Sequence, residues 1–82
     1  MRLNVRLFAT LKERAGTNQL AVEISDRSPT VGILLEQLAY EQPALAESLK
    51  TVIVAVNHDF AFADQSLGAN DEVALFPPVS GG

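Results

Sequence analysis

The chain has no cysteine and no tryptophan, and only six of its 82 residues are basic. The absence of cysteine excludes disulfide bridges, thiolate metal ligands and a cysteine nucleophile. Small secreted domains usually need disulfides for stability, so we expect a cytoplasmic protein. A chain of this length has room for a single domain, and its content of 48% hydrophobic and 20% charged residues is ordinary for a folded one.

Long hydrophobic runs and basic clusters are also missing. The longest strongly apolar stretch, Val52 to Val56, is too short to span a membrane, and the alternating N-terminus lacks the apolar core of a signal peptide. The net charge is −4 and the basic residues are scattered, whereas nucleic-acid-binding proteins cluster them on one face. We therefore expect neither a membrane nor a nucleic acid as partner. An acidic domain suits a partner with a basic cleft.

Catalytic and metal-binding patterns are equally scarce. The only histidine, His58, lies in a predicted turn, and Asp71 and Glu72 are neighbours whose side chains would face opposite sides of a strand. No serine or threonine has a plausible general base beside it in sequence. The glycines do not form a phosphate-binding loop, and metal-ligand spacing is absent. The sequence predicts no bound metal or cofactor and no catalytic side chain within the domain.

Alternating apolar residues predict a sheet. Leu3, Val5 and Leu7 share one face of the first strand, and a short connection to the next strand favours an antiparallel pair. Strands are expected over 2–9, 19–24, 52–56, 60–63 and 72–76.

One principal helix is expected to cover this sheet. Thr30 is the natural N-cap, and four apolar residues then recur on one helix face: Val31, Leu34, Leu35 and Leu38. A short helix over 10–15 is expected to end at Gly16, which readily adopts a left-handed conformation. Another short helix is expected over 44–50. This order predicts an α+β roll, in which a mixed sheet of four to five strands wraps on one main helix.

The same alternation places three phenylalanines on the outer face of the sheet. If Leu7 points into the core, Phe8 points away from it, and Phe76 follows Leu75 in the same way. Phe60 lies just beyond a turn and could join the same face. Together these side chains would form a partner-binding patch. The alternative is a bend that tucks Phe8 or Phe60 into the core.

The last six residues, 77–82, are predicted to form a flexible, extended tail that follows a domain of residues 1–76. Pro77 and Pro78 have fixed φ and no N–H, so they do not continue a central strand. Gly81 and Gly82 have no Cβ and could thread a channel that excludes other residues. Six residues at roughly 3.3 Å each reach about 20 Å from the domain. The alternative is a frayed terminus without a role.

The carboxylate of Gly82 implies two further proteins. An ionised carboxylate is a poor electrophile, whereas its mixed anhydride with AMP can be attacked by sulfur or by an amine. The sequence has neither a nucleotide-binding motif nor a thiol. ATP would therefore be used by an activating partner, and a second partner would accept what the tail carries.

The most specific motif is Asp71-Glu72-Val73 followed by Phe76-Pro77-Pro78-Val79 and the diglycine. With this motif the chain resembles, over nearly its whole length, the small sulfur-carrier subunit of molybdopterin synthase. The resemblance implies the ubiquitin-like β-grasp fold. Further matching segments are Leu7-Phe8-Ala9, Gly16, Pro29-Thr30-Val31 and Ala55-Val56-Asn57.

The resemblance also implies a mechanism. An ATP-dependent adenylating enzyme related to ubiquitin activators (E1-like) would activate Gly82, which then becomes a C-terminal thiocarboxylate (1-thioglycine). Its sulfur would pass to a pterin precursor in the large synthase subunit, with Gly81 as the threading neighbour and the subunits in a heterotetramer. The implied partner-binding residues are Phe8, Phe60, Phe76, Pro77, Pro78, Val79 and Lys12, the last at a position that is often basic.

Three other functions remain open. A sulfur carrier for thiamine thiazole synthesis generally lacks the Phe-Pro-Pro-Val sequence before its diglycine. A ubiquitin-like modifier would join its terminus to lysines of other proteins, and a plain interaction domain would carry an inert tail. The leading hypothesis is a carrier subunit in molybdenum cofactor biosynthesis that has no catalytic residues beyond its own C-terminus.

Overall fold

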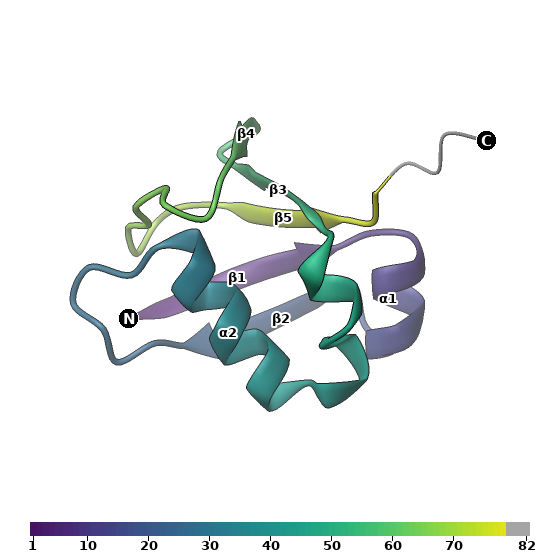
Figure 1. Ribbon diagram of the computed structural model, residues 1–82. Helices are drawn as coiled ribbons and strands as arrows, with labels where there is room; N and C mark the ends of the chain where they lie inside the picture. The colour runs from purple at the N-terminus through teal and green to yellow at the C-terminus, as the bar shows by residue number, and fades with distance from the viewer. Residues whose placement is uncertain (79–82) are drawn as a thin grey trace.

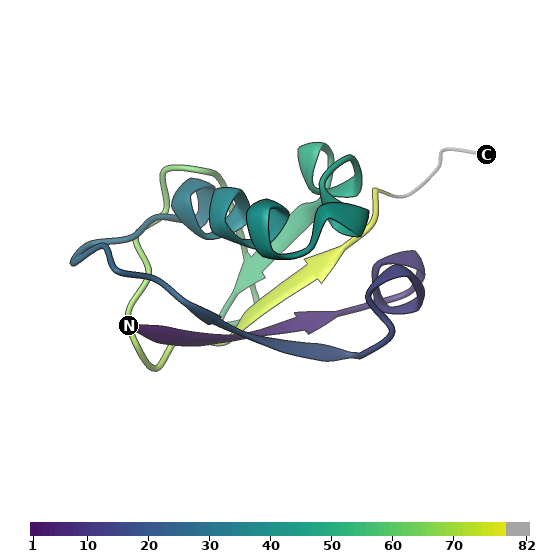
Figure 2. The same ribbon diagram turned by 90° about the horizontal axis from the view of Figure 1, so that it is seen from below.

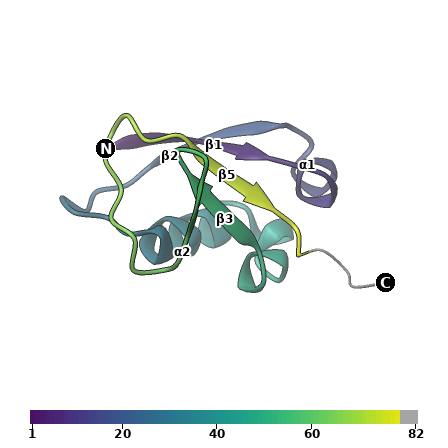
Figure 3. The same ribbon diagram turned by 90° about the horizontal axis from the view of Figure 1, so that it is seen from above.

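The computed structural model describes residues 1–78, whose strands form one five-stranded mixed sheet with the order β2–β1–β5–β3–β4 (Figure 1). Only β1 and β5 run parallel, and every other neighbouring pair is antiparallel. The last strand therefore lies in the middle of the sheet, between β1 and β3 (Figure 3). The strands are β1 (Arg2–Leu7), β2 (Gln19–Glu23), β3 (Ile53–Val56), β4 (Asp59–Ala61) and β5 (Val73–Phe76).

Helix α2 (Val31–Glu41) covers one face of this sheet, and Figure 2 shows the resulting two layers from the side. The hydroxyl of Thr30 accepts a hydrogen bond from the backbone N–H of Ile33 at 3.3 Å, so the predicted N-cap is confirmed. Val31, Leu34 and Leu38 are buried against the sheet. The predicted α+β roll is confirmed, and this arrangement is the β-grasp that the resemblance implies.

The core between these layers is apolar. Among residues 1–78 no polar or charged side chain is buried, so the free energy of folding depends on burial of aliphatic groups rather than on internal ion pairs. The buried aliphatic side chains are Leu3, Val5, Leu7, Leu11, Val22, Ile24, Val31, Leu34, Leu38, Leu45, Leu49, Val54, Val56, Leu67, Val73 and Leu75.

The loop after β4 is tied to the start of α2. The backbone N–H groups of Val31 and Gly32 donate to the carbonyl oxygens of Gln65 and Ala63, each at 2.9 Å. These are donors that the first turn of a helix cannot satisfy internally. A Cβ on residue 32 would lie 3.3 Å from the carbonyl oxygen of Ala63, so the absence of a side chain at Gly32 permits this close approach.

The expected helix over 44–50 is wrong in type. The structure has two 3₁₀ turns there, η1 (Pro43–Leu45) and η2 (Ser48–Lys50). Each turn buries one leucine, Leu45 or Leu49, and such short 3₁₀ turns commonly connect longer elements. Helix α1 (Thr10–Ala15) does end at Gly16, which is left-handed at φ 76°, as predicted.

The strand expected over 60–63 begins and ends earlier, as β4. Asn57 and His58 both have positive φ, 52° and 74°, and this two-residue turn lets Asp59 pair with Val56. Phe62 and Ala63 therefore fall beyond the strand.

Candidate docking surface

The face of the sheet opposite α2 carries a cross-strand row with two alanines at its centre. Ala55 on β3 pairs with Ala74 on β5 and with Phe60 on β4, and Ala74 pairs with Arg6 on β1. Paired residues share a face of the sheet. The small alanine side chains leave the middle of this face low, with larger side chains on both sides.

A mainly apolar hollow of about 300 Å³ lies over these alanines. Phenylalanine side chains from three strands or strand ends border it, and an arginine, a histidine and a glutamate supply its polar rim. Such a combination of an apolar floor and a polar rim is typical of a protein-binding surface. The lining residues are Arg6, Phe8, Ala55, His58, Phe60, Glu72, Ala74 and Phe76.

Phe8 and Phe76 form a stack at one end of this hollow. Their ring centroids are 4.6 Å apart and their planes differ by 11°. The parallel pairing of Leu7 with Leu75 places the next residue of each strand side by side. The Arg6 guanidinium carbon lies 5.6 Å from the centre of the Phe8 ring, within the range of a cation–π contact. The stack thus forms an ordered aromatic wall where β5 ends.

Ala9 holds the backbone next to Phe8 in a strained conformation. Its φ of 54° and ψ of −128° match the first central position of a type II′ turn, which normally requires glycine. The Leu11 N–H donates to the Phe8 carbonyl at 3.2 Å and closes this turn, while the Phe8 N–H donates to the Leu75 carbonyl at 3.2 Å. The backbone of Phe8 is therefore fixed by bonds to two different elements.

The rim of the hollow includes an exposed contact between His58 and Glu72. His58 Nε2 lies 3.3 Å from Glu72 Oε2, with the side chains 87% and 51% exposed. A pair this accessible to water contributes little to stability. Its position beside Phe60 makes it available to a partner's polar groups.

A second, polar hollow of about 580 Å³ adjoins the first and shares Arg6 and Glu72 with it. Asp71 is held there by the backbone N–H of Gly68 at 2.7 Å and by Asn57 Nδ2 at 2.9 Å. The Gly68 hydrogen bond, followed by that of Asn57, lowers the pKa of the Asp71 carboxyl. These hydrogen bonds fix the loop that precedes β5.

The structure brings three of the predicted partner-binding residues together and leaves one apart. Phe8, Phe60 and Phe76 all line the apolar hollow. Phe60 is 81% exposed, so the alternative that a bend tucks it into the core is wrong, and Phe8 is half-buried outside the core. Lys12 is exposed on α1 and does not line the hollow.

The predicted tail begins directly after β5. Pro77 is half-buried and Pro78 is exposed, and neither is part of a strand. The other predicted tail residues, Val79, Ser80, Gly81 and Gly82, lie outside the described residues. In Figures 1, 2 and 3, β5 ends at the same end of the molecule as α1.

Sequence reasoning missed Phe62, which is 82% exposed. The signal was present, because Phe62 lies two residues after Phe60 and period-two alternation puts both on one side of an extended chain. It also missed the low floor made by Ala55 and Ala74, since that floor depends on cross-strand register.

Within residues 1–78 no group of three or more His, Asp or Glu side chains is arranged to hold a metal ion. No helix in this range is long and apolar enough to cross a bilayer.

The whole chain has recognisable relatives. The ThiS family model matches residues 5–82. The molybdopterin synthase sulfur carrier subunit of Chlamydomonas reinhardtii is 37% identical, with 100% of both chains covered. Small archaeal modifier protein 1 of Haloferax volcanii is 39% identical, covering 94% of this chain and 97% of that one. The crystal structure of SAMP1 from Haloferax volcanii matches with a TM-score of 0.86 and 36% identity over 100% of both chains. These matches confirm the resemblance and the ubiquitin-like fold.

Proposed function

Because this chain belongs to the ThiS family, we propose that it is a sulfur carrier in molybdopterin synthesis, with the carboxyl group of Gly82 as its reactive group. The observation that carries this proposal is the match along the whole chain to proteins named molybdopterin synthase sulfur carrier subunits. The apolar hollow supports it, because a carrier without a catalytic site needs a surface that other proteins recognise.

The chemistry begins with activation of the Gly82 carboxylate. One carboxylate oxygen attacks the α-phosphorus of ATP on the activating enzyme, pyrophosphate leaves, and an acyl-adenylate forms. Hydrosulfide from the sulfur donor then attacks the acyl carbon, AMP leaves with the electron pair of the broken C–O bond, and loss of the proton on sulfur leaves the thiocarboxylate. This chain contributes the carboxyl group, and its partners contribute the nucleotide site and the sulfur.

The large subunit of molybdopterin synthase is the proposed acceptor. Phe8, Phe60 and Phe76 around the hollow form the contact surface, and burial of aromatic side chains supplies much of the affinity of such interfaces. Because Phe76 ends β5 and Pro77 follows it directly, docking at this surface fixes where the tail starts. Two copies of each subunit then form a heterotetramer.

The tail and α1 complete the proposed contact. Pro77, Pro78 and Val79 lead toward Gly81 and Gly82, whose lack of a Cβ suits a narrow channel. Lys12 is an exposed cation on α1, at the end of the molecule where β5 ends. There it would attract an acidic group of the partner, but as a point charge rather than a bidentate donor.

The first test measures the mass of the intact chain. After incubation with ATP, the activating enzyme and a sulfur source, we expect the mass to rise by the difference between sulfur and oxygen. A variant that lacks Gly82 should show no such gain under the same conditions. An unchanged mass of the full chain, with an activating enzyme that is active on its own carrier, would reject the proposal.

The second test measures docking and sulfur transfer. Phe76→Arg places a charge in the aromatic wall, and we expect it to weaken binding to the large subunit while the fold persists. The thiocarboxylated protein, mixed with the large subunit and the pterin precursor, should yield a sulfur-containing pterin. Equal binding by Phe76→Arg and the unchanged chain would show that the hollow is not the contact surface.

A ubiquitin-like modifier is the second candidate, because a protein named as a small archaeal modifier is 39% identical. In that case Gly82 would be found in an isopeptide bond with a lysine of another protein. Deletion of the gene would leave molybdenum cofactor levels unchanged. A thiamine requirement after deletion would instead indicate a carrier for thiazole synthesis, and full activity without Gly82 would indicate an inert tail.

A further inference from the structure

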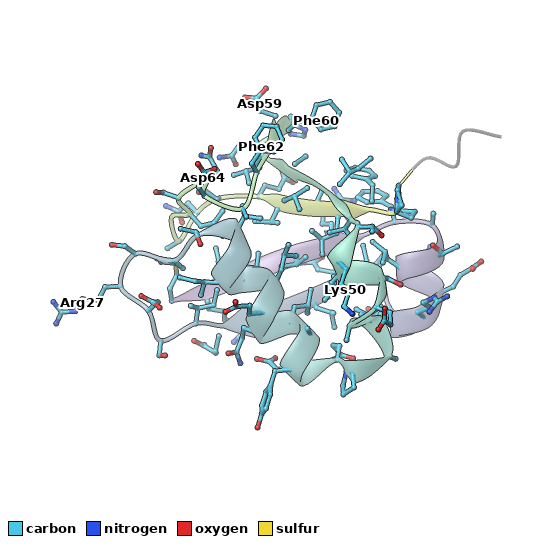
Figure 4. All side chains as sticks on the ribbon, viewed as in Figure 1. Arg27, Lys50, Asp59, Phe60, Phe62 and Asp64 are labelled. Carbon is cyan, nitrogen blue, oxygen red and sulfur yellow. The ribbon has the colours of Figure 1, made fainter. Side chains whose placement is uncertain are left out.

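Two neighbouring aromatic side chains near the edge of the sheet are almost fully exposed. Phe60 is 81% exposed and Phe62 is 82% exposed. Single exposed apolar residues are common, but these two lie close together and Phe60 already lines the apolar hollow. Figure 4 shows both rings at the β4 end of the molecule, far from Arg27 and Lys50. The apolar surface therefore continues beyond the hollow.

The register of the sheet carries the apolar surface from the aromatic stack toward β4. Ile53 pairs with Phe76, and Val54 pairs with Ala61. A row of apolar residues thus runs across the outer face from Phe8 through Phe76 to Ile53, next to the row that contains the two alanines. Phe62 directly follows Ala61, the last residue of β4 that pairs with β3.

Two carboxylates flank this exposed pair in the sequence. Asp59 precedes Phe60 and Asp64 follows Phe62, and Figure 4 shows both carboxylates in this region. In the described sheet β4 pairs only with β3, so it is an edge strand. Charged residues on an edge strand discourage pairing with further copies of the chain. The same carboxylates would attract a partner that carries positive charge.

The backbone that presents Phe62 is fixed by hydrogen bonds. The Phe62 carbonyl accepts from the Gln65 N–H at 3.0 Å, and the carbonyl of Ala63 accepts from the N–H of Gly32 at 2.9 Å. The aromatic side chain therefore projects from a segment that is tied to α2. Binding to it costs less ordering entropy than binding to a loose loop would.

We propose that the docking surface extends across β4 to Phe62, and that the large synthase subunit covers it with an apolar segment flanked by Lys or Arg side chains. This inference rests on the proposed function, because it assigns the extended surface to the same partner. The apolar residues of the segment lie over Phe60 and Phe62, and its cations face Asp59 and Asp64.

The test compares two equally exposed aromatic residues. Phe62→Ser removes the proposed contact, while Tyr40→Ser removes a side chain that is 83% exposed on α2, in the layer on the other face of the sheet. We expect Phe62→Ser to raise the Kd for the large subunit roughly tenfold or more, as truncation of an interface anchor does. Tyr40→Ser should leave the Kd within about twofold, and both variants should keep the melting temperature of the unchanged chain.

The charged flanks are tested with Asp59→Asn combined with Asp64→Asn. We expect slower association with the large subunit and a weaker dependence of that rate on salt, because attraction between opposite charges mainly accelerates encounter. An association rate and salt dependence equal to those of the unchanged chain would overturn the assignment of a cationic segment.

The failure of this inference is distinguishable from that of the proposed function. If Phe76→Arg weakens binding while Phe62→Ser binds like Tyr40→Ser, the docking surface ends at Phe60 and the extension is wrong. If Phe62→Ser weakens only binding to the activating enzyme, the assignment to the large subunit is wrong. If neither Phe76→Arg nor Phe62→Ser affects either partner, the proposed docking surface fails as well.

Discussion

The two faces of the sheet differ in how their side chains are packed, although both arise from the same alternation of residues along the strands. One face packs against α2, and the other lies opposite to it. Toward α2, the side chains of Val5, Val73 and Leu75 are 0% exposed and contact other apolar groups of the same chain. On the opposite face, Ala74 and Arg6 alternate with them, and the small side chains leave a hollow of about 300 Å³. One face is filled and the other is left open.

Because of this difference, the residues that determine stability and those that determine affinity for a partner lie on different faces of the same strands. A substitution on the filled face changes the volume of a close-packed core, so its cost appears in the free energy of unfolding. A substitution on the open face changes a shape that no described residue fills, so its cost appears in the affinity for a partner. Substitutions at adjacent positions of one strand should therefore change different quantities, the free energy of unfolding for one and the affinity for a partner for the other.

The largest expected effect is on the filled face. Leu75→Ala removes a side chain that is 0% exposed and should lower the free energy of unfolding by about 2–5 kcal/mol, because it leaves a cavity at the centre of the sheet. Urea denaturation followed by circular dichroism measures this change. If the free energy of unfolding falls by less than about 1 kcal/mol, the core relaxes around the cavity and the face toward α2 is not closely packed at this position.

The next largest effect is expected on the open face, at the floor of the hollow, and it concerns affinity rather than stability. Ala74→Leu fills the floor of the hollow, so we expect the free energy of unfolding to stay within about 0.5 kcal/mol and the Kd for the large subunit to rise about tenfold. The matched control is Ala21→Leu, which makes the same change on β2, on the same face but outside the hollow. Equal binding by both variants would mean that the hollow is not occupied by the partner.

A smaller change in stability, of opposite sign, is expected at Ala9, where the backbone next to Phe8 is strained. Ala9→Gly relieves a left-handed conformation that costs about 1–3 kcal/mol and adds about 0.5–1 kcal/mol of chain entropy. The net stabilisation of about 1 kcal/mol corresponds to a rise in melting temperature of about 4–8 °C for a domain of this size. Ala15→Gly in α1 is the control and should be destabilising, because that residue is helical. A lower melting temperature for Ala9→Gly would contradict the strain.

The smallest effect concerns pH. Hydrogen bonds from Gly68 and Asn57 lower the pKa of Asp71 in the folded chain, so this group stabilises the fold above the ordinary carboxyl pKa. The contribution is lost as the pH falls through the lowered value, below about pH 4. Asp71→Asn should therefore lose slightly less stability between pH 7 and pH 3 than the unchanged chain, as measured by thermal unfolding. An identical pH dependence would show that these hydrogen bonds form equally with the protonated acid.

Local patterns were sufficient to predict most of the fold. The alternation of apolar residues predicts which side of β1 and β5 is buried. Thr30 predicts the start of α2, and Gly16 predicts the end of α1. The prediction for 44–50 has the wrong helix type, because a short apolar stretch that follows Pro43 is too short for its periodicity to distinguish an α-helix from a 3₁₀ helix.

The open face was harder to predict, because it is built from contacts between distant strands. The outward direction of Phe8 and Phe76 followed from alternation, but their stacking depends on the parallel pairing of β1 with β5. The strain at Ala9 had no signal at all, since alanine is not a residue that normally marks a left-handed turn. Phe62 was overlooked although its spacing from Phe60 pointed to the same side.

Because β5 lies in the middle of the sheet but is its last strand in the sequence, the docking surface forms only after this strand has been translated. A ribosome delivers β1 early and β5 after every other strand, and domains fold as units once their parts have emerged. Before residues 73–76 emerge, Phe8 has no ring to stack on and Ala74 is missing from the floor of the hollow. A nascent or prematurely terminated chain that lacks β5 therefore lacks the complete hollow, so the proposed docking surface exists only in chains that have been translated and folded through this strand.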